Sequence, residues 1–180
     1  MKTITILFLM LLGSRIYSQI YVGENCKITF FSETKMENID AVNTVTKPVF
    51  NAATGDFAIK ASQNAFTFKS AFMQEHYNEN YVESEKYPYA TFTGKVSETI
   101  DYSKNGSHNV SMVGKLDMHG VTLPRTIDGT ITVKDGTLTL DSKFNVRVAD
   151  HKIKVPSLYV EKIAESIQVT FHTEMVPLKK

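Results

Sequence analysis

The side chains best suited to acid–base or metal chemistry in this 180-residue chain are its five histidines, which are His76, His108, His119, His151 and His172. No two of them stand at a metal-ligand spacing such as HxH or HExxH, so a metal site would need ligands from distant segments. A nucleophile elbow of the GxSxG type is also absent. The sequence therefore predicts no catalytic group, no metal and no cofactor.

A secreted hydrolase or isomerase is the enzymatic alternative. Such an enzyme would have to use His119, Asp117 or His151, all of which lie near expected turns. Asp117 and His119 are close in the sequence, but closeness along the chain is weak evidence for a catalytic dyad because a dyad is defined by the geometry of its side chains.

Arg125 is a charged residue on a strand face that is otherwise apolar. Leu123 and Ile127 are expected on the same face. A guanidinium that faces an apolar interior needs an anionic partner such as a carboxylate or a phosphate. The alternative is that Pro124 breaks the register of the strand and turns Arg125 outward.

These residues lie in or beside a predicted β-hairpin, Val110 to Val133. Apolar residues alternate with polar ones on both sides of the dipeptide His119-Gly120, and a period of two is typical of antiparallel strands with one apolar face. Glycine accepts positive φ without steric cost, so His119-Gly120 is the expected turn.

Most of the remaining chain also alternates with a period of two. β-branched and aromatic residues recur at every second position between Gly, Asn and Asp residues that favour turns. One segment, Ser70 to Tyr81, instead has apolar residues at helical spacing, and Ser70 is its expected N-cap. We expect this helix to lie across one end of the sheet. The pattern predicts eight to ten strands and one or two short helices. Such a chain forms an antiparallel barrel or a two-sheet sandwich, whose interior is either filled or holds a small ligand.

The first 18 residues combine one early lysine, an apolar run too short to cross a bilayer, and a polar end. They indicate a signal peptide (residues 1–18) followed by a single domain (residues 19–180), exported to the periplasm or secreted without a lipid anchor.

Of 20 basic residues, Lys2 and Arg15 would be removed with the signal peptide, which leaves 18 basic residues against 19 acidic ones. A nearly neutral domain is not expected to bind nucleic acid. Stable insertion into a membrane is not expected either, because no second apolar stretch is long enough to span one. The lone Cys26 is expected to be a buried apolar residue.

Several segments, in this order and spacing, resemble the YceI-like family of secreted lipid-binding proteins. The matching segments are Ile28–Ser32, Phe66–Phe68, Met73–Tyr81, Tyr87–Gly94 and Gly114–Thr122. The family often has lysine before the proline that follows its HGVT motif, whereas this chain has Leu123, Pro124 and then Arg125. The resemblance implies an all-β, lipocalin-like antiparallel β-barrel of about eight strands that is not an enzyme. It also implies a lumen that holds a long apolar ligand, either a polyisoprenoid or a fatty-acid derivative, for transport, storage or sequestration.

On this basis we expect a set of mostly apolar side chains to bind the ligand, with a helical lid at one mouth and two basic residues near a polar head group. The lumen residues are Phe30, Phe66, Phe68, Phe92, Met112, Leu116, Met118, Phe144 and Phe171; the lid residues are Phe72, Met73 and Tyr77; the head-group residues are His119 and Arg125. A shift of one residue in any strand would invert its assignments. A filled-core barrel that acts as an interaction module is the other alternative, and a homodimer is left open.

Overall fold

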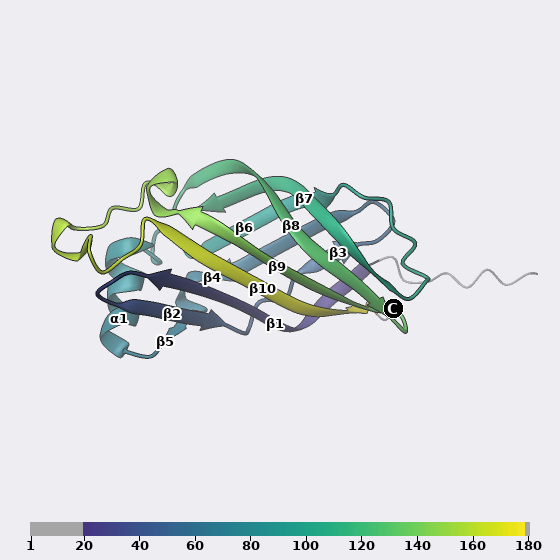
Figure 1. The fold of residues 1–180 in the computed structure, drawn as a ribbon, viewed down its shortest axis with the longest axis horizontal. Helices are drawn as coiled ribbons and strands as arrows, with labels where there is room; N and C mark the ends of the chain where they lie inside the picture. Colours follow the sequence, from purple (N-terminus) through teal and green to yellow (C-terminus); the bar gives the residue numbers. More distant parts are fainter. Residues whose placement is uncertain (1–19, 179–180) are drawn as a thin grey trace, which may run out of the picture.

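The protein is an antiparallel β-barrel, seen in a computed structural model that describes residues 20–178 (Figure 1). Its strands are β1 (Ile20–Glu33), β2 (Asn38–Asn43), β3 (Val49–Asn51), β4 (Asp56–Ser62), β5 (Thr67–Phe68), β6 (Tyr89–Val96), β7 (Gly106–Met118), β8 (Val121–Lys134), β9 (Thr137–Arg147) and β10 (Ser166–Pro177). The helical segments are η1 (Gln63–Ala65), α1 (Ala71–His76), η2 (Tyr77–Tyr81), η3 (Val148–His151) and η4 (Ser157–Tyr159).

The barrel closes because the first and last strands pair with each other. The hydrogen-bonded order is β10-β9-β8-β7-β6-β4-β3-β1, and β1 then returns to β10, with Tyr21 opposite Pro177 and Phe30 opposite Val169. Strand β2 extends the sheet beside the C-terminal half of β1, and β5 pairs with β2. Eight strands therefore form the closed ring, which confirms the predicted lipocalin-like all-β class.

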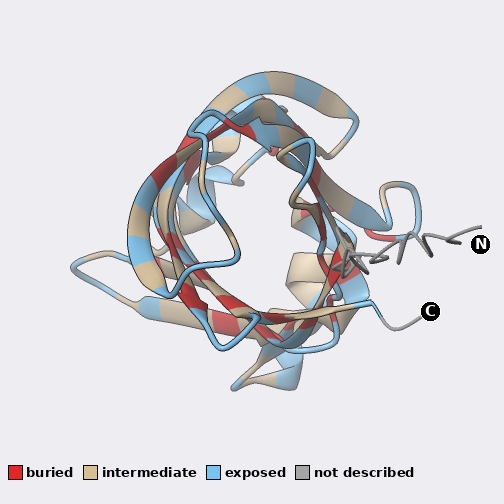
Figure 2. Cartoon of the chain, turned by 90° about the vertical axis from the view of Figure 1, so that its right-hand side faces the viewer, coloured by how far each residue is buried: buried red, intermediate tan, exposed pale blue. Residues whose placement is uncertain are grey.

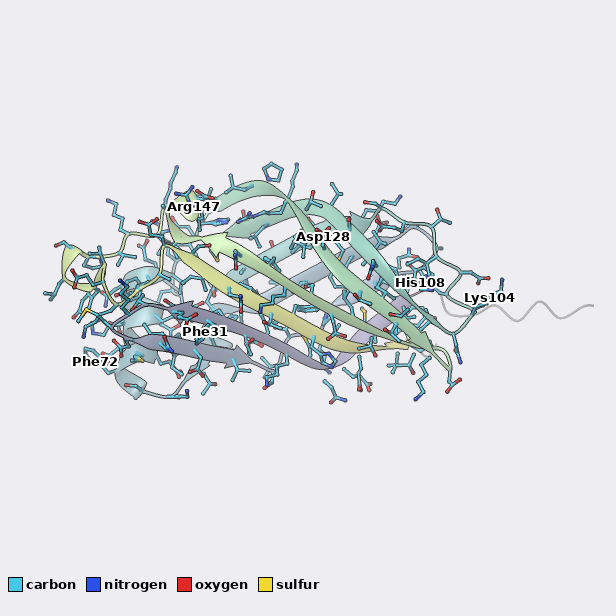
Figure 3. All side chains as sticks on the ribbon, viewed as in Figure 1. Phe31, Phe72, Lys104, His108, Asp128 and Arg147 are labelled. Carbon is cyan, nitrogen blue, oxygen red and sulfur yellow. The ribbon has the colours of Figure 1, made fainter. Side chains whose placement is uncertain are left out.

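Alternation of side chains separates the two faces of the barrel. Viewed along its length, buried and exposed residues alternate around the ring of strands (Figure 2). Outward residues such as Asp128 and Arg147 are exposed and point away from the sheet (Figure 3). Inward residues such as Met112, Leu140 and Met175 are almost completely buried. The period-two pattern of the sequence thus corresponds to the inner and outer faces of the barrel.

The hairpin β7–β8 has the predicted turn and register. Met118 pairs with Val121, and the intervening His119 and Gly120 have φ angles of 53° and 70°. Two consecutive residues with positive φ match the twist of a tight hairpin. The register continues without interruption through Pro124, so Arg125 stays in the inward phase opposite Gly114. The alternative in which Pro124 turns Arg125 outward is therefore wrong.

The short helix begins where the sequence predicts. Ser70 has extended dihedral angles, and its hydroxyl accepts a hydrogen bond from the backbone N–H of Met73. Helix α1 then continues into the π-helical turn η2, which ends at Tyr81. Figure 1 shows α1 at the end of the barrel away from the end of β10, beside the turn between β1 and β2.

Cys26 is buried on the inner side of β1, at an irregularity in the pairing with β10 between Glu24 and Lys27. Burial raises the pKa of its thiol to about 11, although a hydrogen bond with Thr173 opposes that shift. At pH 8 only about one such thiol in a thousand is ionised, and the thiolate is the reactive form. We expect iodoacetamide to modify the native protein at least about a hundredfold more slowly than the urea-unfolded chain, as followed by mass spectrometry. Equal rates would contradict the burial of Cys26.

Candidate ligand-binding site

The barrel encloses a cavity of about 360 Å³. A volume of this size is typical of small-molecule sites, and most of the wall is apolar. Strands β1, β4, β6, β7, β8, β9 and β10 all contribute side chains to the wall. At one end the rim includes Glu37 from the turn after β1, Phe72 and His76 from α1, and Tyr159 from η4. The arrangement can enclose a flexible apolar molecule and admit it from the helical end.

The structure places twelve of the fourteen predicted binding residues on the cavity wall. They are Phe30, Phe66, Phe68, Phe72, Met73, Tyr77, Phe92, Met112, Leu116, Met118, Phe144 and Phe171. His119 and Arg125 are not among the lining residues, so a head-group role for either one stays a prediction. The sequence could predict these residues because side chains along a strand point alternately inward and outward. Once one residue of a strand is correctly assigned to the inner face, the direction of the others follows.

Aromatic side chains from four segments meet at the helical end of the cavity. The Tyr77 ring stacks on Phe30 with centroids 5.4 Å apart and contacts Phe66 and Phe68 at 6.0 and 5.0 Å. Contacts of this geometry add to the apolar burial of the rings. Phe72, in contrast, is 62% exposed and packs on His76, with their rings 4.1 Å apart. Tyr77 thus anchors the helical cap, while Phe72 forms part of its outer rim.

Gln63 is a polar residue of the cavity wall that the sequence analysis missed. It is 1% exposed, in the short helix η1 after β4. The Tyr77 hydroxyl donates a 2.6 Å hydrogen bond to its side-chain oxygen, and burial raises the pKa of that hydroxyl above its ordinary value. A glutamine in the segment Ala61–Phe66 gives no sequence signal for a site, because its partner is fourteen residues away on another element.

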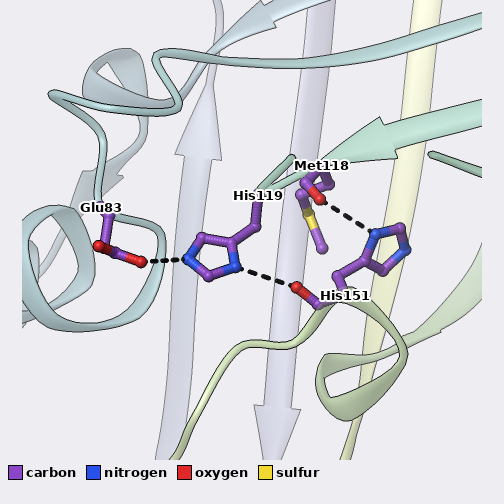
Figure 4. A network of polar contacts seen from close by, with 4 residues as sticks. All are labelled: Glu83, Met118, His119 and His151. Atoms are coloured by element: carbon purple, nitrogen blue, oxygen red, sulfur yellow. Dashed lines mark hydrogen bonds and ion pairs between the residues drawn. The ribbon is translucent and has the colours of Figure 1, made fainter. Parts of the chain in front are cut away.

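The two histidines of the enzymatic alternative belong to a network that joins three loops (Figure 4). His119 contacts a carboxylate oxygen of Glu83 through Nε2 at 2.7 Å and the backbone carbonyl of His151 through Nδ1 at 3.0 Å. Both ring nitrogens of His119 therefore have hydrogen-bonding partners within the protein. The Asp117 carboxylate instead accepts from the Thr122 hydroxyl.

His151 completes this network from a fully buried position. Its Nδ1 lies 3.2 Å from the carbonyl oxygens of Met118 and Val121, at the two sides of the β7–β8 turn. Its Nε2 is buried without a hydrogen-bond partner among the described residues. The network therefore holds the β7–β8 turn against the loop before β6 and the loop after β9.

We expect the His119→Ala variant to lower the free energy of unfolding by about 1–2 kcal/mol, because two hydrogen bonds and a packing contact with Tyr87 are lost. Glu83 is partly exposed, which limits the contribution of the ion pair. Urea unfolding measures the change. The matched control is His172→Ala, which removes an exposed pair with Asp141 and should cost about 0.5 kcal/mol or less. Equal effects of the two substitutions would refute the structural role of His119.

Arg125 occupies the inner phase of β8 between Leu123 and Ile127. Its Nε and Nη2 atoms are buried and have no hydrogen-bond partner in the described part of the chain. Pairing between β8 and β9 extends from Gly129 to Lys134, so Arg125 lies in the part of β8 that has left β9. Burial of these two guanidinium nitrogens without partners is unfavourable, so an anionic contact for Arg125 stays a prediction.

The structure describes residues 20–178 of the chain. No cluster of three or more His, Cys, Asp or Glu side chains in this range is arranged to hold a metal ion. Within the same range, no helix has the length and apolar character needed to cross a bilayer. The predicted signal peptide, residues 1–18, lies outside the described residues.

The fold and the cavity define a class of protein: a closed, eight-stranded antiparallel barrel with an apolar lumen, similar in architecture to the lipocalins. A family model for the YceI-like domain matches residues 24–175. The chain therefore belongs to the YceI-like family.

Solved structures share this fold at low sequence identity. One is described as a polyisoprenoid binding domain from Saccharophagus degradans implicated in plant cell wall breakdown; it is 14% identical, with a TM-score of 0.76 over 89% of this chain and 99% of that one. BcnA of Burkholderia cenocepacia is 16% identical, with a TM-score of 0.70 over 83% and 95%. The Campylobacter jejuni YCEI protein is 17% identical, with a TM-score of 0.57 over 73% and 78%. No curated protein matched the sequence.

Proposed function

We propose that this protein binds a long-chain apolar ligand, a polyisoprenoid or a fatty-acid derivative, inside the barrel. The observation that carries the proposal is the 360 Å³ cavity with its largely apolar wall. Each methylene that moves from water into such a wall contributes about 0.8 kcal/mol, less the cost of ordering the chain. Binding of this kind requires no catalytic group. The polyisoprenoid-binding description of the Saccharophagus degradans structure supports the same ligand class.

The cellular role that fits this ligand is carriage, storage or sequestration of a lipid outside the cytoplasm. Such a ligand is nearly insoluble, so a barrel that covers it allows it to cross an aqueous compartment. The signal-peptide pattern of residues 1–18 supports export to the periplasm. The filled-core interaction module is disfavoured because a filled barrel would have no room for a cavity of this volume.

Native mass spectrometry of the protein purified from the periplasm of its own cells tests the proposal. We expect a bound species of several hundred daltons that organic solvent extracts and that fragments as an isoprenoid or acyl chain. The same spectra report whether the protein is a monomer or a homodimer. Repeated recovery of the bare polypeptide, together with no uptake of added long-chain lipid, would overturn the proposal.

A further inference from the structure

The cavity wall contains a buried hydrogen-bond donor with no partner. Gln63 lines the cavity and is 1% exposed, and its Nε2 atom makes no hydrogen bond with any described residue. A buried amide group that lacks a partner carries a free-energy cost, because it has lost the hydrogen bonds that it makes in water. This donor therefore requires either a water molecule or a polar atom of a ligand.

The backbone around Gln63 holds the side chain in place. Its N–H donates to the carbonyl of Pro88 at 2.9 Å, and its own carbonyl accepts from the N–H of Phe66 at 3.2 Å. The first bond joins the short helix η1 to the segment before β6, and the second closes the C-terminal end of η1. Gln63 thus extends from a fixed turn rather than from a free loop.

Tyr77 fixes the orientation of the Gln63 amide. The Tyr77 hydroxyl donates to Oε1 at 2.6 Å, and its ring packs against Phe30, Phe66 and Phe68. An amide has an oxygen that accepts and a nitrogen that donates, so engagement of the oxygen leaves the nitrogen as the group for a third partner. The bond from Tyr77 therefore leaves Nε2 as the polar group of this amide that has no partner among the described residues.

We propose that Gln63 Nε2 donates a hydrogen bond to an uncharged acceptor oxygen of the bound ligand, such as a carbonyl or ether oxygen. The inference rests on the proposed function and refines it: the ligand is an oxygen-bearing apolar chain rather than a pure hydrocarbon. A neutral acceptor suits this position because the surrounding rings offer little solvation for a carboxylate or phosphate, whose burial would be costly. The Gln63–Tyr77 pair is then a residue pair that determines specificity within the lumen.

A pair of matched probes tests the inference: a C20 isoprenoid ketone and the same chain with the carbonyl replaced by a methylene. A site that hydrogen-bonds one ligand discriminates against an analogue that leaves its buried donor unpaired. We expect the delipidated wild-type protein to bind the ketone about five- to tenfold more tightly, the range of one neutral hydrogen bond. Isothermal titration or fluorescence competition provides both dissociation constants.

Variants separate the hydrogen bond from the general fit of the chain. The double variant Gln63→Met with Tyr77→Phe removes both polar groups of the pair while it keeps their size. We expect its affinity for the ketone to fall to that for the hydrocarbon, with the hydrocarbon affinity changed by less than about twofold. The matched control is Ser84→Ala, which removes a buried hydroxyl group that does not line the cavity and should leave the ketone preference unchanged.

A direct measurement on the wild-type protein does not depend on any variant. The infrared carbonyl stretch of a ¹³C-labelled ketone should shift to lower frequency in the lumen than in a hydrocarbon solvent, because a donor weakens the C=O bond. Equal affinities for the two probes, together with an unshifted carbonyl band, would overturn the inference and leave the proposed function intact. Failure of the wild-type protein to bind either probe would overturn both.

Discussion

Replacing Val169 by tryptophan is expected to weaken the binding of long-chain ligands about a hundredfold while the barrel remains folded. Val169 lies on β10, faces inward and lines the cavity, although it is only partly buried. Its pairing partners on the two neighbouring strands are Phe30 of β1 and Phe144 of β9. An indole at this position would take up part of the 360 Å³ cavity. Exclusion of about four methylenes from the wall removes about 3 kcal/mol, which corresponds to about a hundredfold in the dissociation constant.

The outer face of the same strand provides the control. Thr170 is the next residue and is exposed on the outside of the barrel, so Thr170→Trp adds the same ring without reducing the cavity. Each variant is purified from the periplasm, and its bound lipid is measured by native mass spectrometry and by titration with a fluorescent long-chain probe. Retention of bound lipid by a folded Val169→Trp protein would show that the ligand does not occupy the barrel.

Replacing Gly114 by alanine is expected to destabilise the protein by about 3 kcal/mol, near the upper end of the usual cost of overpacking. Gly114 of β7 pairs with Gly94 of β6. A Cβ atom at Gly114 would overlap the backbone oxygen of Thr93 and lie 2.5 Å from the Cα of Gly94 and 2.9 Å from the ring of Phe92. Two of these neighbours are backbone atoms that cannot move aside without disturbing the β6–β7 ladder.

Gly106→Ala is the matched control for this substitution. Gly106 is also in β7, but the nearest atom to its added Cβ is the end of the flexible His108 side chain at 3.3 Å. A change of about 0.5 kcal/mol or less is expected there, since the neighbour can rotate away. Urea denaturation of both variants supplies the comparison. A Gly114→Ala protein as stable as Gly106→Ala would indicate that β6 and β7 are farther apart than in this structure.

Local pattern accounts for the elements that sequence reasoning identified correctly. The β7–β8 hairpin follows from period-two alternation around His119-Gly120, and the start of α1 follows from Ser70 as an N-cap. Most of the predicted lumen residues line the cavity for the same reason, since alternation decides the face of a strand before any tertiary contact forms. Membership of the barrel class came from the resemblance, because alternation alone also fits a two-sheet sandwich.

The polar contacts of the interior were not predictable in this way. Glu83, rather than the nearby Asp117, is the carboxylate partner of His119, and it lies 36 residues away in sequence. The Gln63–Tyr77 pair likewise joins the end of β4 to the helical cap. Neither pair has a characteristic spacing, because the distance between its members along the chain reflects the topology of the fold and not the chemistry of the contact.

The sequence by itself determined the strands, their inward faces, the hairpin turn and the absence of any compact catalytic or metal-binding motif. Those features depend on residues a few positions apart, where backbone geometry links sequence spacing directly to direction in space. Tertiary structure decided that β1 closes on β10, that the interior keeps a cavity, and that the buried amide nitrogen of Gln63 has no partner among the described residues. Closure depends on pairing between strands more than a hundred residues apart. No local period encodes how completely side chains from eight strands fill the space between them.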